Sequence, residues 1–398
     1  MPDKSCKGNI HLALILLISF LIALFFVYKN YSSDFIATAG KPGVSVPSPT
    51  PASVCNMPLI PEFNKAAVLT GTGVNDKLIL IKQPTAINLS GDFTIEAWIK
   101  LNDIQTINSE GRKTIFGRAS TGNTAGVSLS MERIDITSLI IPRLKLTVAS
   151  LPYNQNYIGE TIYGTSPILP NMWYHVAAVK NGSNLSLFIN GKKEKLLDNG
   201  QSSQDGVYTG QLLDSGDSPI SIGGLYFDGA IKEENNIEGA IEEVRISNSA
   251  RYSANFTVSV NPFTTDVNTM ALFHLDENTI DSTGSNTGEI LGDVIFSDSS
   301  LQYSPDSDFD GWSDCSESKI GTNFSKACPM NIKDVVWVPD FNNDKKVDSN
   351  DRRIIDNAFD PKTYLNAKYN KRYDLNTDGK LDTKDRNLIE FFINQSCN

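Results

Sequence analysis

Three twelve-residue segments near the C-terminus repeat one pattern of oxygen-bearing side chains, and this pattern constrains the fold of the chain most strongly. The segments are residues 306–317, 340–351 and 374–385, here called loops 1, 2 and 3. Each loop places a carboxylate or amide at positions 1, 3, 5, 9 and 12, which is the spacing that a loop wrapping a Ca²⁺ ion requires. Carboxylates crowded in this way repel one another until a cation neutralises them, so we expect the tail to fold together with its metal.

About three Ca²⁺ ions are therefore expected, held by side-chain oxygens at the five positions and by the backbone carbonyl at position 7. The same residue types also suit any acidic surface turn, but three full matches within eighty residues favour metal loops over that alternative. Position 6 is a sharp turn, where Gly311 and Gly379 stand in loops 1 and 3 but Lys345 stands in loop 2. The expected ligands are Asp306, Asp308, Asp310, Trp312, Asp314 and Glu317 in loop 1, Asp340, Asn342, Asp344, Lys346, Asp348 and Asp351 in loop 2, and Asp374, Asn376, Asp378, Lys380, Asp382 and Asp385 in loop 3.

Loops 2 and 3 each lead into a segment with apolar residues at helical spacing, RRIIDNAF and RNLIEFFI. Val347 and Leu381, at position 8, are apolar residues that can anchor each loop to a core. This duplicated loop and helix, residues 335–396, resembles a dockerin type I module. The resemblance implies two repeats that pack as a pseudo-symmetric pair and dock onto a cohesin domain. In that family the partner contacts fall at positions 10 and 11, here Ser349, Asn350, Thr383 and Lys384, which are not the Ser-Thr pair common in cellulosome dockerins.

Loop 1 differs from the other two, since DSDFDGWSDCSESKIGTNFSKACP resembles the thrombospondin type 3 style loops of bacterial surface proteins. That resemblance covers about twenty-four residues.

At the other end of the chain, residues 10–28 form an uncharged apolar stretch. At about 1.5 Å per residue, a helix of this length spans a bilayer. Lys4 and Lys7 precede the stretch, which favours a cytoplasmic N-terminus and export of everything that follows. We therefore expect a single-pass protein in a bacterial membrane with the bulk of the chain outside. The alternative is a signal peptide cleaved near Ala37–Ala39, which would give a secreted protein.

Four of the five cysteines follow the apolar stretch, in what would be an oxidising space. Cys315 and Cys328 lie close together in sequence, so we expect a local bridge between them, which would stabilise a segment too small to build a core. Cys55 and Cys397 form the remaining pair. Alternatively, these two are free or paired between molecules, which the sequence does not decide.

Between these ends the chain reads as β-structure with short turns. Alternating apolar residues mark FTIEAWIKL at residues 93–101, and Asn181-Gly182 and Asn190-Gly191 are hairpin turns of a favoured type. The segments FTIEAWIKL, MWYHVAAVKNGSNLSLFINGKKE and GAIEEVRISNSARYS resemble the LamG-like, concanavalin A-like jelly roll. The resemblance implies an antiparallel β-sandwich in a family that includes glycan binders, protein binders and, among relatives of the sandwich, glycoside hydrolases.

The expected fold class is therefore mainly β, with a jelly-roll sandwich, a small α Ca²⁺ loop-helix module and an N-terminal transmembrane helix. The expected domains are a cytoplasmic N-terminus at 1–9, a signal anchor at 10–28, a Pro/Ser-rich linker at 29–55, a LamG-like jelly roll at 56–300, a thrombospondin type 3-like loop at 301–330 and a dockerin-like module at 331–398.

A hydrolase on this sandwich needs two carboxylates about 5 to 10 Å apart. The sequence has no Glu-x-Asp-x-x-Glu strand, and Glu96 stands alone, while Glu242 and Glu243 are adjacent and would point to opposite faces. There is no nucleophile elbow and no phosphate loop. Tryptophans 98, 173, 312 and 337 could stack on sugars, although such residues more often fill a core or clamp a loop.

The net charge of −11 argues against long basic patches for nucleic acid. The sequence thus predicts a non-catalytic, membrane-anchored recognition or adhesion protein. Its jelly roll would bind a glycan or protein, and its Ca²⁺-stabilised tail would dock a cohesin-type partner. The alternatives are a carbohydrate-active enzyme or accessory module of polysaccharide degradation, and a structural surface-assembly protein.

Overall fold

The computed structural model describes residues 65–69, 77–102, 112–118, 126–135, 140–150, 158–197, 205–210, 212, 218–227, 229–232, 235–259, 261–299, 305–359 and 369–397. All of them belong to one compact unit, Pro51–Asn398. The predicted cytoplasmic N-terminus, membrane span and linker lie outside these residues. Within the described ranges, no helix is both long enough and apolar enough to cross a membrane.

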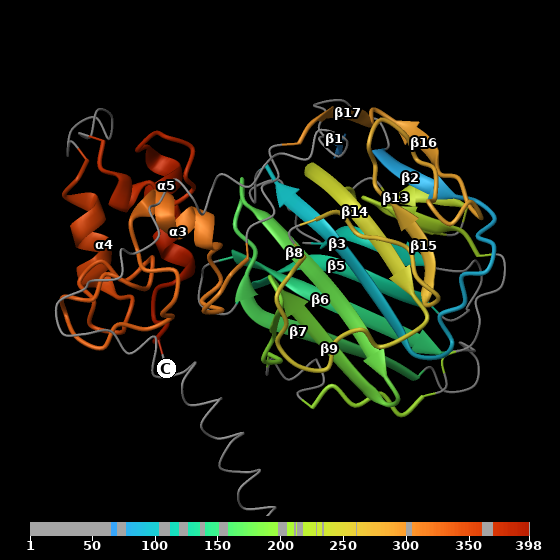
Figure 1. Ribbon diagram of the computed structural model, residues 1–398, viewed down its shortest axis with the longest axis horizontal. Coiled ribbons are helices and arrows are strands. Elements are labelled where there is room, and N and C mark those ends of the chain that lie inside the picture. Colours follow the sequence, from blue (N-terminus) through green and yellow to red (C-terminus); the bar gives the residue numbers. More distant parts are fainter. Residues whose placement is uncertain are drawn as a thin grey trace, which may run out of the picture. The chain divides into compact units, whose positions relative to one another are not determined.

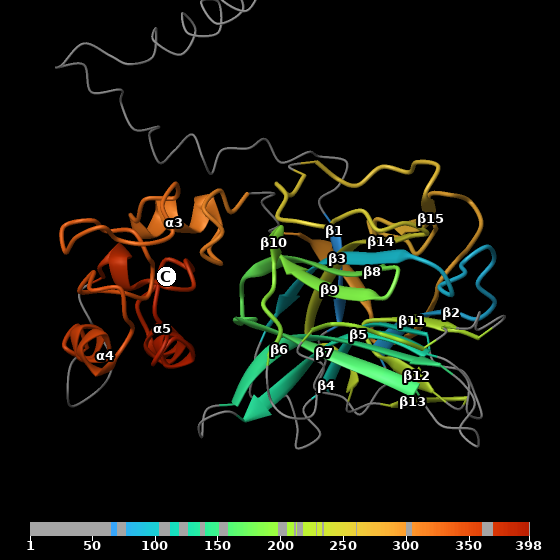
Figure 2. The same ribbon diagram turned by 90° about the horizontal axis from the view of Figure 1, so that it is seen from below.

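The larger part of the structure is a sandwich of two antiparallel sheets, as the sequence predicted (Figures 1 and 2). One sheet has the order β10-β9-β8-β3-β14-β1-β17, with β15 on β14, and the other has the order β16-β2-β11-β4-β5-β6-β7. A short hairpin, β12-β13, stands apart from both. The strands are β1 Lys65–Leu69, β2 Lys77–Ile81, β3 Phe93–Leu101, β4 Arg112–Arg118, β5 Gly126–Asp135, β6 Ile140–Ser150, β7 Ile158–Pro167, β8 Trp173–Asn181, β9 Asn184–Ile189, β10 Lys192–Lys193, β11 Ile220–Ile222, β12 Leu225–Phe227, β13 Ala230–Lys232, β14 Gly239–Ser247, β15 Thr269–Phe273, β16 Glu289–Gly292 and β17 Ile295–Asp298.

The sandwich core follows from the alternation of side chains along the strands. On β3, the predicted inward residues Phe93, Ile95, Ala97, Ile99 and Leu101 are all buried in the main core cluster. The opposite face of β3 is buried as well, because the chain that follows β14 packs over it and forms a second apolar cluster there. The central strands are therefore covered on both faces, which the alternation alone did not predict.

Both predicted hairpin turns are present and differ in type. Asn181 pairs with Asn184, and Gly182 has a φ of 56° at the first central position, which fits a type II′ turn. In the next hairpin, Asn190 and Gly191 both have positive φ, 49° and 80°, which fits a type I′ turn. The register of β8, β9 and β10 is thus set by their turns.

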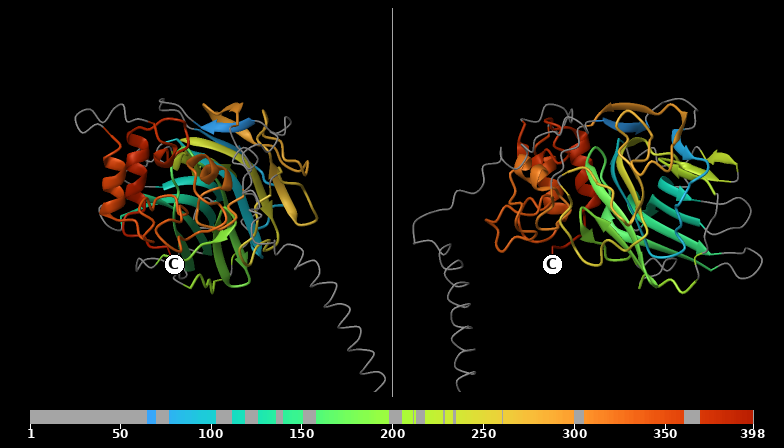
Figure 3. Two further views of the ribbon diagram at one scale, coloured as in Figure 1. Left: turned by 60° about the vertical axis from the view of Figure 1, so that its left-hand side comes forward. Right: turned by 45° about the vertical axis from the view of Figure 1, so that its right-hand side comes forward.

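The tail after the sandwich is built from short helices and ordered loops, drawn in orange and red in Figure 3. The helices are α3 Asp314–Ile320, α4 Ser349–Asp356 and α5 Thr383–Leu388, with 3₁₀ turns η2 Lys371–Tyr373 and η3 Ile389–Phe391. Val347 is fully buried among apolar residues of the tail, and Leu381 packs partly buried against them. These two residues anchor loops 2 and 3, as the sequence analysis predicted.

The disulfide pairing corrects the prediction. Cys328 is bonded to Cys397, with Cα atoms 5.6 Å apart, so neither the Cys315–Cys328 bridge nor the Cys55–Cys397 bridge forms. Cys315, which is buried on α3, is itself disulfide-bonded, and Cys55 lies outside the described residues.

A backbone ladder explains the pairing. Loop 2 and the last residues of the chain lie side by side: Asn394 N–H donates to the Val347 carbonyl and Val347 N–H to the Gln395 carbonyl. Cys397 N–H donates to the Lys345 carbonyl. This long-range ladder, rather than closeness in sequence, brings Cys397 to Cys328.

Candidate metal centre

The backbone of loops 1, 2 and 3 has the same conformation. Position 6 has positive φ in each loop, 102° at Gly311, 74° at Lys345 and 82° at Gly379. Position 4 also has positive φ in each loop, with 60° at Phe309, 59° at Asn343 and 54° at Thr377. The loops therefore make the same two sharp turns although their residues differ.

The first aspartate of each loop holds those turns in place. Asp306 accepts hydrogen bonds from the N–H groups of positions 5 and 6 at 3.2 and 3.0 Å. Asp340 accepts the equivalent bonds at 3.1 and 2.8 Å, and Asp374 at 3.1 and 3.0 Å. The chain thereby wraps around this carboxylate, which brings the side chains of positions 3 and 5 to the same centre.

Positions 3 and 5 are fixed by one hydrogen bond each. The oxygen at position 3 accepts the N–H of position 5 at 3.2 Å in loop 1, 3.0 Å in loop 2 and 3.1 Å in loop 3. The carboxylate at position 5 accepts the N–H of position 7 at 2.8, 3.0 and 2.9 Å. In loop 1 this leaves the second oxygens of Asp308 and Asp310 without a hydrogen-bond donor. In loops 2 and 3 position 3 is an asparagine with a single oxygen, and its amide donates to the second carboxylate oxygen of position 5.

The closing residue at position 12 separates loop 1 from the other two. Asp351 accepts three backbone N–H groups, from Phe341, Asn342 and Asp348, and Asp385 accepts two. In the same two loops the aspartate at position 9 caps α4 or α5. In loop 1 position 12 is Glu317, whose side chain is one methylene longer than that of the aspartates at position 12 of loops 2 and 3. One of its oxygens accepts the Thr322 hydroxyl at 3.1 Å, and Oε2 is buried without a partner.

Loop 1 collects unbalanced negative charge. Oxygens of Asp306, Asp308 and Asp310 lie within 4.8 Å of one another. Oδ2 of Asp308, Oδ2 of Asp310 and Oε2 of Glu317 are all buried without a hydrogen-bond donor. Burial, reinforced by Asp308, raises the pKa of Asp306 to about 8, and burial together with Asp310 raises the pKa of Glu317 to about 11.

Such a centre fits a hard divalent cation, because several oxygens converge where no protein donor reaches them. Asp314 takes no part in this group of orphaned oxygens, since both of its oxygens accept bonds from Ser307.

Loops 2 and 3 are more exposed and are partly balanced by their asparagines. Asn342 donates to Asp344 at 3.0 Å, and Asn376 donates to Asp378 at 3.2 Å. Burial still raises the pKa of Asp340, and it raises that of Asp385 to about 6. Lys345 adopts the left-handed conformation that Gly supplies in loops 1 and 3, so its presence costs strain but leaves the loop formed.

The two loop-helix repeats are joined by arginines that the sequence analysis missed. Arg372 of η2, just before loop 3, donates to the Asp340 carbonyl at 3.0 Å and stacks over Phe341 at 4.8 Å. Burial lowers the pKa of Arg372 to about 10, so it stays charged at neutral pH. Arg386 of α5 pairs with Asp356 of α4 at 2.6 Å. Arginines of the second repeat thus bind the first repeat and stabilise the pair. The spacing of residues within the loops does not predict these contacts.

The predicted partner-contact residues, Ser349 and Asn350 on α4 and Thr383 and Lys384 on α5, are all exposed. Lys384 also lines a cavity of about 410 Å³ together with Trp98 and other sandwich residues. The α4 pair does not line that cavity.

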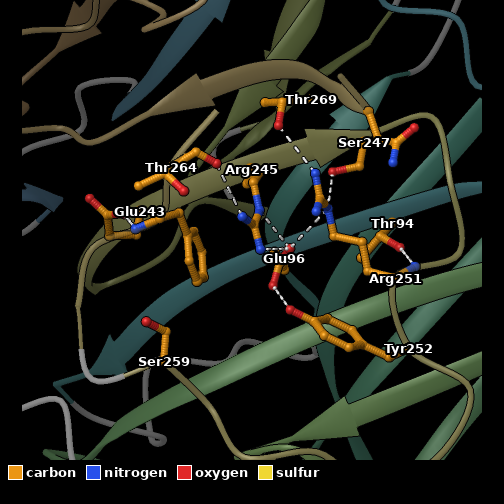
Figure 4. Close-up of polar contacts among 12 residues, drawn as sticks. Thr94, Glu96, Glu243, Arg245, Ser247, Arg251, Tyr252, Ser259, Thr264 and Thr269 are labelled. Carbon is orange, nitrogen blue, oxygen red and sulfur yellow. Dashed lines mark hydrogen bonds and ion pairs between the residues drawn. The ribbon is translucent and has the colours of Figure 1, made fainter. Parts of the chain in front are cut away.

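The carboxylates considered for catalysis have structural partners in the sandwich. Figure 4 shows Arg245 and Tyr252 pointing at Glu96 from two sides. Arg245 Nε donates to Glu96 at 2.9 Å and Tyr252 Oη at 2.8 Å, and His175 Nε2 lies 3.0 Å away. Burial alone would raise the pKa of Glu96, but His175 and Arg245 hold it below its ordinary value. Glu96 is fully buried, so this cluster pins the segment after β14 onto β3.

Glu242 and Glu243 are likewise buried acceptors. Glu242 accepts the Ser299 hydroxyl at 2.6 Å. Glu243 sits at an irregularity of β14 with a φ of 58°, accepts the Phe263 N–H at 2.6 Å and contacts His274 at 2.5 Å. The three carboxylates hold segments of the sandwich together and do not form an open acid pair.

Comparisons with known proteins agree with this division of the chain. The family model of the concanavalin A-like lectin/glucanases superfamily matches residues 73–255, and that of the dockerin type I domain matches residues 338–394. No curated protein matches the chain.

Several solved structures are similar to the sandwich. The native heptameric SAP-like pentraxin from Limulus polyphemus is 16% identical over 60% of this chain and 97% of its own, with a TM-score of 0.39. Domain 4 of AbnA, a GH43 extracellular arabinanase from Geobacillus stearothermophilus, in complex with arabinotriose, is 16% identical over 46% of this chain and 71% of its own, with a TM-score of 0.30. Domains LG4-5 of the mouse laminin alpha1 chain are 12% identical over 48% of this chain and 46% of their own, with a TM-score of 0.28. By the two family matches, the chain carries a domain of the concanavalin A-like lectin/glucanases superfamily, followed by a dockerin type I domain.

Proposed function

We propose that this protein is an exported, Ca²⁺-binding recognition protein of a bacterial surface. The sandwich presents a binding surface for a glycan or protein, and the tail binds three Ca²⁺ ions and docks a cohesin-type partner. Residues 10–28 tether the chain to the membrane. The observation that carries the proposal is the common frame of loops 1, 2 and 3, in which the first aspartate of each loop accepts the same two backbone N–H groups.

Bound Ca²⁺ supplies positive charge that neutralises the loop carboxylates and cross-links the two ends of each loop. The chain itself supplies the positions of the donors. Asp306, Asp340 and Asp374 shape the loops, and in loop 1 Asp308, Asp310 and Glu317 each offer an oxygen that has no hydrogen-bond donor. In loops 2 and 3 the side-chain oxygens at positions 3 and 5 take the same part. Arg372, which lies just before loop 3, then stabilises loop 2 by donating a hydrogen bond to the Asp340 carbonyl.

For the sandwich, a binding role is favoured over hydrolysis because Glu96, Glu242 and Glu243 are buried and occupied by protein partners. A hydrolase needs a carboxyl group that reaches the glycosidic oxygen, and none of these three is open to a substrate. The dockerin type I match supports the second candidate function, in which the chain is an accessory module of a polysaccharide-degrading assembly.

Docking is proposed to use the α4 repeat. Ser349 and Asn350 are exposed and stand outside the cavity that Lys384 lines with the sandwich, so a partner reaches them without displacing other contacts. A cohesin domain bound in Ca²⁺ and released in chelator would support docking. Substituting Ser349 and Asn350 together by alanine should weaken it, while substituting Thr383 and Lys384 together should matter less.

The first experiment is a binding screen of the full chain against polysaccharides and cell-wall fractions, with Ca²⁺ and with chelator, and with the supernatants assayed for released sugar. Binding without release supports the recognition role. Sugar release would overturn it in favour of a hydrolase. Asp344→Ala and Asp378→Ala should each remove one Ca²⁺ ion per chain, and an unaltered ion count would refute the assignment of loops 2 and 3.

A further inference from the structure

A cavity of about 490 Å³ lies where the sandwich meets loop 1 and the C-terminal segment. The sandwich side is lined by residues of β6, β7 and the chain around β10, and the other side by positions 4 to 7 of loop 1 and residues near Cys397. Its size is within the range of small-ligand sites, which is about 300 to 1,000 Å³. The proposed Ca²⁺ binding by the loops and the structural cluster around Glu96 assign no function to this cavity.

Arg143 of β6 is the unusual residue of this cavity. It lines the cavity and is only 5% exposed, and its Nε and Nη1 are both buried without a hydrogen-bond partner. The charge of Glu194 stabilises the Arg143 cation but does not fill these two donors, because both oxygens of Glu194 accept bonds from Ser166, at 2.7 Å from N–H and 2.8 Å from the hydroxyl. A buried cation with unfilled donors is costly unless an anion completes it.

The other residues that line the cavity indicate which kind of molecule carries the anionic group. Trp312, Trp337 and Tyr174 line the same cavity and form largely buried aromatic walls. Lys192 adds a second positive side chain, while Glu194 and Asp310 are acidic and limit how much negative charge the cavity accepts. One carboxylate on a ring with an apolar face fits this set better than a dianionic phosphate, because a guanidinium matches a planar carboxylate and an aromatic face matches a ring.

We propose that this cavity binds an acidic sugar, with Arg143 holding the carboxylate of a uronic acid and Trp312 and Trp337 packing against its ring. The inference rests on the proposed glycan-binding function and adds the site, the anchoring residue and the charge of the ligand. Binding depends on Ca²⁺ as well, because Asp310 and Trp312 are both donors of loop 1 and wall residues of the cavity.

The test compares two probes that differ mainly in charge, trigalacturonate and its trimethyl ester, by titration calorimetry on the full chain in Ca²⁺. The acid should bind at least tenfold more tightly than the ester. Arg143→Gln should weaken binding of the acid at least tenfold and leave the affinity for the ester unchanged. Arg112→Gln is the matched control, since it removes the same charge from β4 at a residue that does not line the cavity, and it should leave both affinities unchanged. Chelator should abolish binding of the acid to the unaltered chain.

A merely structural role for Arg143 predicts a different result. If the guanidinium serves a ligand, Arg143→Gln removes a buried charge whose Nε and Nη1 lack hydrogen-bond partners, so the ligand-free protein should melt at the same temperature or higher. The acid should raise the melting temperature of the unaltered chain, a readout that needs no variant. Equal binding of acid and ester overturns this site while the glycan-binding function stands. If neither probe binds and no neutral glycan binds, both the site and the proposed glycan-binding function are overturned.

Discussion

Replacing Glu317 by glutamine should stabilise the tail strongly without Ca²⁺ and much less with Ca²⁺. In the metal-free protein the side chain is fully buried against Asp310 and Asp308, with one oxygen unpartnered. Glutamine has nearly the same shape and can still accept the Thr322 hydroxyl. It removes a charge that the apo fold disfavours and that the holo fold requires.

The magnitude follows from the pKa of Glu317, which rises from 4.5 to about 11 because of burial first and of Asp310 second. A group whose pKa is raised in the folded state favours folding fully at pH values below the unfolded pKa, and this contribution is lost as pH rises towards the folded pKa. At pH 7, about 2.5 units above 4.5, the loss is about 3 kcal/mol at about 1.36 kcal/mol per unit. In chelator, Glu317→Gln should therefore stabilise the tail by up to about 3 kcal/mol at pH 7 and by almost nothing at pH 4.

With Ca²⁺ most of this gain is lost, because the variant loses a charged ligand at loop 1. At a free Ca²⁺ concentration 100 times the original dissociation constant, a hundredfold loss of affinity lowers the stabilisation by Ca²⁺ from about 2.7 to about 0.4 kcal/mol, which leaves a net gain of about 1 kcal/mol. Differential scanning calorimetry of the full chain measures both effects on the transition that moves with Ca²⁺. Asp334→Asn is the control, since it removes one charge outside the three loops and should shift that transition by less than about 1 kcal/mol. A shift of equal size in chelator and in Ca²⁺ would refute the metal role of Glu317.

Three further predictions concern the disulfide, the buried cluster and the strained loop. Cys397→Ser should destabilise the tail by about 4 kcal/mol from loop-closure entropy, because the bridge to Cys328 spans 69 residues; calorimetry in reducing and non-reducing buffer checks this, and an equal effect in both would contradict it. Glu96→Gln should lower the stability of the sandwich by about 3 to 5 kcal/mol by leaving buried cations unpaired, whereas Asp266→Asn, at a side chain 45% exposed, should cost no more than about 1 kcal/mol in the same urea titration. Lys345→Gly should stabilise the Ca²⁺-bound tail by up to about 1 kcal/mol by relieving positive φ, and a lower melting temperature would show that the lysine side chain contributes more than its strain costs.

The features that could be predicted from sequence are those in which local spacing dictates geometry. In a twelve-residue loop, the side chain of Asp340 can reach only the N–H groups a few residues ahead, so the spacing of donors nearly determines the loop. The same holds for Asn190-Gly191, whose positive φ values are intrinsic preferences of these residues. The segments FTIEAWIKL and GAIEEVRIS match β3 and β14 because side chains alternate between the two faces of a strand, so apolar residues at every second position mark a face that packs in a core.

The features that could not be predicted depend on segments far apart in the chain. Cys328 is closer to Cys315 in sequence, yet it bonds Cys397 because loop 2 pairs with the C-terminal residues. Glu96 stands alone in its strand, and its partners Arg245 and Tyr252 come from about 150 residues further on. Arg143 carries no motif at all; only the burial of its guanidinium and the occupation of Glu194 by Ser166 single it out.

The sequence by itself therefore determined the sandwich, the common frame of loops 1, 2 and 3 and the dockerin type I repeat, because short-range periodicity and donor spacing act within one element. Only the tertiary structure decided which cysteine is paired with Cys328, which carboxylates are structural and where the donors of a buried cation are left without a hydrogen-bond partner. These depend on burial, and burial is a property of all the segments that pack around a residue, which no stretch of sequence contains on its own.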